Sequence, residues 1–186
     1  MSNPEARFDK RQVQAAWRLF DEAHPPCASA GLIYLLEESA GRLLLDGGES
    51  LYPGGLYIGP LAGSPSAESG LAIRGIQIST PATSPRRLCR TQIPVVTAPG
   101  SRTRLLAGRI GQCASPLPWP GALLDLHLDT AASWTLPDGH RARVIVIKGA
   151  LQDGCTPVAA GGEHAIDGAA TLHAGCRSHA LIWLEG

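Results

Sequence analysis

Few side chains in this sequence combine the types and the spacing that chemistry requires. His24 and Cys27 lie three residues apart, and an imidazole beside a thiol can act as the general base for a thiolate nucleophile. No third group nearby would orient such a base. We therefore favour the interpretation of His24 as a loop histidine ahead of two prolines, exposed or hydrogen-bonded.

A second group of ligand-type side chains is found near the middle of the second half. Asp125, His127 and Asp129 alternate with leucines and would share one face of a strand. Neighbouring members would then be about 6.5–7 Å apart, too far for all three to reach one ion at about 2 Å. We therefore expect a solvated outer face here. The other histidines of this half are predicted to lie at the surface or in turns, namely His140, His164, His173 and His179.

The bulk composition excludes several classes of function. Lys and Arg total 16 and so do Asp and Glu, so no net field would attract nucleic acid or an anionic membrane. The odd number of cysteines, five, and the absence of a CxxC pair fit a reducing compartment. No window approaches the ~20 apolar residues of a membrane span, and the first ten residues contain no apolar run of signal-peptide length. We expect a cytoplasmic protein with no direct contact to nucleic acid or membrane.

The elements that position these side chains are predicted to be strands. The 22 glycines and 15 prolines divide the chain into short apolar runs, which is typical of strands joined by turns. Leu124, Leu126 and Leu128 alternate with polar residues, and the β-branched run 144–147 predicts a fully buried strand. One helical pattern stands apart, because apolar residues over 8–22, including Trp17 and Phe20, can share one helix face. Residues 81–90 are the candidate linker.

The order of motifs over residues 24–186 resembles the pirin family. The motifs follow one another in the family's order. His24-Pro25-Pro26 stands where the family has His-Pro-His, and Pro53-Gly54-Gly55 stands where it has Pro-Gly-Asp. The remaining matches are Tyr34-Leu35-Leu36-Glu37, Ile76-Gln77-Ile78-Ser79 and the start of the second barrel, Arg104-Leu105-Leu106-Ala107-Gly108.

The resemblance implies an all-β fold of two tandem cupin (jelly-roll-like) β-barrels with a short N-terminal helix. The expected divisions are a helical segment over 1–23, a first barrel over 24–98 and a second barrel over 101–186. A loose echo between residues 32–37 and 144–149 fits a duplicated barrel.

The resemblance also places four metal-ligand positions in the first barrel, and most have lost their ligand atoms. They fall at His24, Pro26, Ala67 and Ser69, with Glu68 able to replace Ser69 after a one-residue slip. Two protein ligands rarely hold a divalent ion against water, and three are the usual minimum. We therefore expect no metal cofactor, the alternative being iron or another divalent transition metal.

The favoured hypothesis is a binding module that takes up a small apolar molecule or a protein partner in the first-barrel cavity. One alternative is a metal-dependent oxidoreductase of the quercetin dioxygenase type with a rearranged site. Another is a metal-free lyase, isomerase or cyclase that uses the emptied barrel. The residues predicted to line the cavity are His24, Cys27, Tyr34, Tyr57, Glu68 and Gln77.

Overall fold

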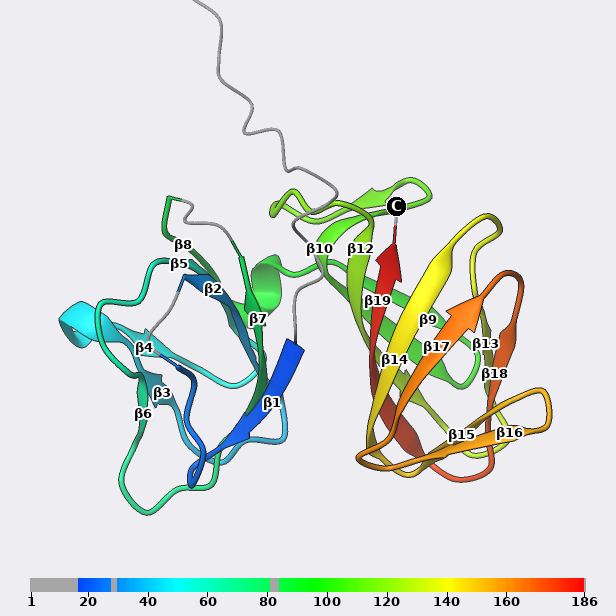
Figure 1. Cartoon of the computed structure of the whole chain (residues 1–186), viewed down its shortest axis with the longest axis horizontal. Coiled ribbons are helices and arrows are strands. Elements are labelled where there is room, and N and C mark those ends of the chain that lie inside the picture. Colours follow the sequence, from blue (N-terminus) through cyan, green and yellow to red (C-terminus); the bar gives the residue numbers. More distant parts are fainter. Residues whose placement is uncertain (1–16, 28–29, 81–83, 186) are drawn as a thin grey trace, which may run out of the picture. The chain divides into compact units, whose positions relative to one another are not determined.

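The computed structural model describes residues 17–27, 30–80 and 84–185. Within them the chain is nearly all β, as the sequence predicts, with two short 3-10 turns as its helical elements (Figure 1). It divides into two compact units, Met1–Gln92 and Ile93–Gly186. In the described part of the chain, no helix has the length and apolar character that crossing a bilayer requires.

The first unit contains two antiparallel sheets. One has the strand order β1-β7-β2-β5-β8 and the other has the order β4-β3-β6. An apolar core fills the unit, with Ile33, Leu35, Leu43, Leu51 and Ile73 among its buried members. The elements are β1 (Trp17–Asp21), β2 (Gly31–Leu35), β3 (Leu43–Leu44), η1 (Asp46–Gly48), β4 (Ser50–Leu51), β5 (Leu56–Gly59), β6 (Ser66–Ala67), β7 (Arg74–Ser79), β8 (Arg86–Leu88) and η2 (Arg90–Gln92).

The helix predicted over residues 8–22 is wrong for the part that is described. Trp17–Asp21 form β1, an edge strand paired with β7 from Trp17↔Ile78 to Asp21↔Arg74. Trp17 and Phe20 are both buried but point to opposite faces of the strand, so their helical spacing is misleading. A Cβ on Gly75 would lie 2.2 Å from Phe20 Cζ, so glycine at this position makes room for the ring. Residues 1–16 of the predicted segment are outside the described residues.

The linker predicted over residues 81–90 is also partly structured. Arg86–Leu88 form β8, which extends the first sheet beside β5. The strand β9 (Val95–Ala98), expected at the end of the first barrel, pairs instead with β10. The division between the units therefore falls after Gln92.

The second unit contains a seven-stranded and a four-stranded sheet. The larger has the order β11-β10-β12-β19-β14-β17, with β9 added beside β10, and the smaller has the order β13-β18-β15-β16. After β9 the strands are β10 (Ser101–Ile110), β11 (Cys113–Ala114), β12 (Ala122–Leu128), β13 (Ser133–Thr135), β14 (Arg141–Lys148), β15 (Ala150–Asp153), β16 (Thr156–Ala159), β17 (Glu163–Asp167), β18 (Thr171–Ala174) and β19 (Ser178–Glu185).

The two central strands of the larger sheet, β12 and β19, have faces of different chemistry. Leu124, Leu126 and Leu128 of β12 enter the core of the unit, which confirms the predicted alternation. Ala180, Ile182 and Leu184 of β19 enter the same core. Since successive strand residues point to opposite faces, the intervening side chains lie on the face away from this core. Those side chains include Asp125, His127 and His179.

Candidate functional site

In the first unit, Gln77 anchors the backbone of Cys27. The Cys27 amide donates to Gln77 Oε1 at 2.8 Å, and Gln77 Nε2 donates to the Cys27 carbonyl at 3.1 Å. Gln77 is 3% exposed. The strand β7 is therefore buried on the face that carries Gln77 as well as on the predicted apolar face that carries Ile76 and Ile78. Both ends of the amide are occupied by backbone groups, which gives Gln77 a structural role.

The two predicted tyrosines lie on opposite faces of the first sheet. Tyr57 is opposite Ile33 in register, enters the core of the unit, and donates its hydroxyl to the Pro60 carbonyl at 2.7 Å. Tyr34 is fully buried and is opposite Leu56, on the other face. The structure therefore does not bring the two rings into one cavity.

The ligand positions implied by the family resemblance do not converge on a polar centre. His24 has a side chain that is 72% exposed, with its Nδ1 3.1 Å from Asp21 Oδ1. The His24 amide donates to the same oxygen at 2.7 Å, and this bond is the main reason that the pKa of Asp21 is lowered. Pro26 is buried, Ser69 is exposed, and Ala67 packs against the apolar core.

The two other predicted groups of this unit are paired with cations. Glu68 Oε1 lies 3.3 Å from Arg42 Nη2, with both side chains more than a third exposed. The Cys27 sulfur accepts from Arg18 Nη1 at 2.6 Å. His24 pairs with Asp21 and not with Cys27, so no base–thiol pair is formed here.

Ligand-type side chains do converge in the second unit, on the face of β12 and β19 away from the core. Asp125 Oδ1 lies 2.6 Å from His179 Nε2 and 3.2 Å from His127 Nε2. The two imidazoles are cross-strand partners and stack with centroids 4.0 Å apart and planes inclined by 15°. This arrangement follows from the register, since opposite residues in antiparallel strands have their Cβ atoms about 4.5–5.5 Å apart.

Two sequence predictions fail at this cluster. Asp125 is fully buried, whereas a solvated face was expected, and His179 is buried, whereas a surface or turn position was expected. Asp129, the third member of the predicted row, follows the end of β12 and is exposed. The third ligand-type group, His179, belongs to the adjacent strand β19. The spacing of residues along β12 alone therefore does not reveal it.

The electrostatics of the cluster favour an ionised carboxylate. Burial by itself would raise the pKa of Asp125, but the contacts with His127 and His179 outweigh burial and hold that pKa far below its usual value. An ionised carboxylate only accepts hydrogen bonds, so His179 carries its proton on Nε2 in this arrangement. The cluster therefore places a buried negative charge beside two stacked imidazoles.

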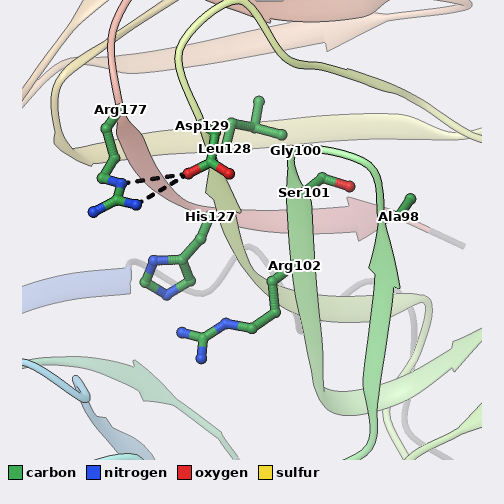
Figure 2. A pocket seen from close by; sticks show the side chains of 8 residues that line it. All are labelled: Ala98, Gly100, Ser101, Arg102, His127, Leu128, Asp129 and Arg177. Atoms are coloured by element: carbon green, nitrogen blue, oxygen red, sulfur yellow. Dashed lines mark hydrogen bonds and ion pairs between the residues drawn. The ribbon is translucent and has the colours of Figure 1, made fainter.

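A polar pocket of about 390 Å³ opens beside the cluster (Figure 2). Figure 2 shows His127 and Arg102, cross-strand partners on β12 and β10, pointing to the same side. Arg177 donates to Asp129 Oδ1 from Nε and Nη2, each at 3.3 Å. His127 is 29% exposed and is the one member of the cluster that lines this pocket.

The β9–β10 turn shapes the rim of the pocket. Gly100 has φ 69°, in the left-handed region, and its carbonyl accepts from the Asp129 amide at 2.8 Å. A Cβ on Gly100 would lie 2.8 Å from the Cβ of Ala132. Glycine at this position therefore lets the turn close against the loop that carries Asp129.

The fold belongs to a known class of architecture, the cupin or pirin-like β-fold. The chain is similar to the crystal structure of quercetin 2,3-dioxygenase from Acinetobacter baumannii, with TM-score 0.65 and 16% identity over 94% of this chain and 69% of that chain. It is also similar to the bacterial pirin YhhW from Escherichia coli in complex with nickel(II), with TM-score 0.57 and 17% identity over 93% and 77%.

A third similar structure is that of YhaK from Escherichia coli, with TM-score 0.58, 16% identity, and coverage of 96% of this chain and 90% of that chain. No protein-family model matches the sequence, and no curated protein matches it significantly. Identities this low establish a shared fold and leave the chemistry to be argued from this chain's own residues.

Proposed function

We propose that this chain is a two-barrel cupin of the pirin type that binds a small anionic molecule in its second unit. The observation that carries the proposal is the polar pocket of about 390 Å³ beside His127. Its lining presents the guanidinium groups of Arg102 and Arg177, an imidazole and the Ser101 hydroxyl, against the single carboxylate of Asp129. This excess of cationic groups suits a carboxylate or phosphate, and the volume suits a small ligand.

The first unit is proposed to hold no metal ion. Of the four positions implied by the resemblance, His24 alone has a side chain with a strong ligand atom, and that side chain is exposed and paired with Asp21. Ala67 packs against a core of leucine, isoleucine and aromatic side chains. The residues present therefore do not fit the family's ion, since three protein ligands are the usual minimum.

The same residues argue against the dioxygenase alternative. A rearranged site of His24 and Glu68 would need both groups to face the barrel interior. Instead, His24 pairs with Asp21, and Glu68 pairs with Arg42 at 3.3 Å. The apolar ligand predicted for the first barrel is also less favoured, because apolar side chains pack together in that interior.

The test is a thermal-shift and calorimetric titration of the whole chain with oxalate as the probe, in the presence of EDTA. A ligand at ten times its Kd adds about 1.4 kcal/mol, which raises the Tm of a chain of this size by about 3–6 °C. We expect this rise in the native chain and in Arg86→Ala, an exposed arginine of β8. We expect its loss in Arg102→Ala, and equal shifts in the two variants would contradict the proposal.

A further inference from the structure

We propose that Asp125, His127 and His179 form a binding site for a divalent transition-metal ion in the second unit. The metal site goes beyond the proposed function, because an anion can bind to the neighbouring arginines whether or not a metal ion is present. It is also separate from the metal positions implied by the family resemblance, which lie in the first unit.

The distances within the cluster fit a common coordination centre. The three ligand atoms all lie within 4.8 Å of one another. Ligands held at 2.0–2.2 Å around one ion are about 3–3.5 Å apart at octahedral or tetrahedral angles. Of the contacts from Asp125 Oδ1, the 3.2 Å to His127 Nε2 lies within this range and the 2.6 Å to His179 Nε2 lies just below it. Small side-chain movements, together with release of the proton from His179 Nε2, would admit an ion.

One atom of the cluster lacks the partner that its burial demands. His127 Nε2 is buried and makes no hydrogen bond of good geometry among the described residues, although it lies 3.2 Å from Asp125. Buried polar atoms without a protein partner are rare in folded proteins, and such atoms commonly bind an ion or a water molecule. Coordination would satisfy this nitrogen without moving it out of the sheet face.

The same histidine has the room that coordination requires. A metal ion lies near the plane of each imidazole that binds it, so two rings stacked at 4.0 Å must tilt apart to share one ion. His179 and Asp125 are buried, whereas His127 borders the open pocket. The expected response to the ion is therefore a rotation of the His127 ring toward the pocket.

The donor set selects a class of ion. Two imidazoles and one carboxylate suit zinc, cobalt, nickel or ferrous iron, and do not suit calcium or magnesium, which prefer oxygen ligands alone. A site with three protein ligands leaves a coordination position open. Arg102 and Arg104 of β10 lie opposite His127 and Asp125 in register. Their positive charges oppose a cation, so we expect a micromolar Kd and not a nanomolar one.

The test is a titration of the metal-free whole chain with Co²⁺, followed by visible absorption and calorimetry. The account predicts one Co²⁺ per chain, with ligand-field bands and no thiolate-to-metal charge-transfer bands. His127→Ala should weaken binding at least tenfold, because even losing a group that only supports a ligand costs about 10–100-fold in metal affinity. His173→Ala is the matched control, an exposed histidine of the same unit, and should leave Kd unchanged.

The partly exposed His127 is the primary variant because replacing the buried Asp125 or His179 risks the fold. Asp125→Asn is the second variant, and circular dichroism checks that it folds before titration. Absence of Co²⁺ binding up to ~1 mM, an unchanged Kd in His127→Ala, or thiolate bands from the cysteines would each overturn the proposal. Since oxalate binding is measured in EDTA, its failure or success is independent of this result.

Discussion

Both units pack antiparallel sheets around an apolar core, but they arrange their polar side chains differently. In the first unit, the histidine and carboxylate expected to act together, His24 and Glu68, have separate partners: His24 pairs with Asp21 and Glu68 with Arg42. In the second unit, Asp125, His127 and His179 meet on one face of two paired strands. In this chain, ligand-type side chains come together where two paired strands hold them in register. The positions given by the linear family motif in the first unit do not bring them together.

The largest expected effect comes from removing the centre of the second-unit cluster. Asp125→Ala leaves two imidazoles facing a buried space without their acceptor, and we expect a loss of about 3–5 kcal/mol in the free energy of unfolding. Urea denaturation measures it. Asp167→Ala, which breaks the exposed pair with Arg141, is the control and should cost under about 1 kcal/mol. Equal losses in the two variants would show that the cluster is not a buried polar centre.

The comparison can also be tested by introducing metal-ligand side chains into the first unit. In the double variant Pro26→His and Ala67→His, the new side chain at residue 67 must enter an apolar core. Overpacking of this kind costs about 1–3 kcal/mol, and we expect no added Co²⁺ per chain. Elemental analysis after dialysis gives the count. A second equivalent of metal would mean that the first barrel still has the geometry of a metal site.

A smaller effect is expected at Gln77, the buried polar residue of the first unit. Gln77→Ala removes two hydrogen bonds to Cys27, and water can replace part of them because Cys27 is exposed. We expect a loss of about 1–2 kcal/mol in chemical denaturation. Gln152→Ala, at an exposed position of β15, should stay within about 0.5 kcal/mol. A negligible loss in Gln77→Ala would remove its structural role and return it to the candidate ligand-binding groups.

The smallest expected effect concerns a surface thiol of the first unit. The Thr91 hydroxyl lies 3.1 Å from Cys89 Sγ, and this hydrogen bond is the main cause of the lowered pKa of the Cys89 thiol. The thiolate is the form that reacts. At pH 7.5, iodoacetamide should therefore modify Cys89 faster than the exposed Cys155, and Thr91→Ala should slow Cys89 alone. Peptide mass mapping reads out the rates, and an unchanged Cys89 rate in Thr91→Ala would contradict the assignment.

Much of the fold was predictable because local patterns record which face of a strand is buried. The leucines of residues 124–128 and the β-branched run 144–147 gave correct strands, since a period of two and β-branched side chains both report burial in a sheet. The spacing of Trp17 and Phe20 gave a helix instead of β1. An edge strand covered on both faces can bury residues three apart, and that pattern imitates one helix face.

The cluster could not be predicted from local patterns, because it depends on the pairing of strands that are distant in the sequence. Asp125 and His179 are 54 residues apart in the sequence, and the register of β12 with β19 brings them together. Considering residues 125, 127 and 129 alone gave the correct face but the wrong third member. The alternation in residues 178–184 puts His179 on the face of the strand away from Ala180 and Ile182. Pairing this strand with the apolar strand 122–128 would therefore have suggested the cluster.

The most direct measurement is the anomalous scattering of a crystal of the whole chain grown with Co²⁺. The account predicts one peak within coordination distance of Asp125, His127 and His179, and none in the first unit. A peak beside His24 or Glu68, with no density at the second-unit cluster, would contradict the contrast between the two units.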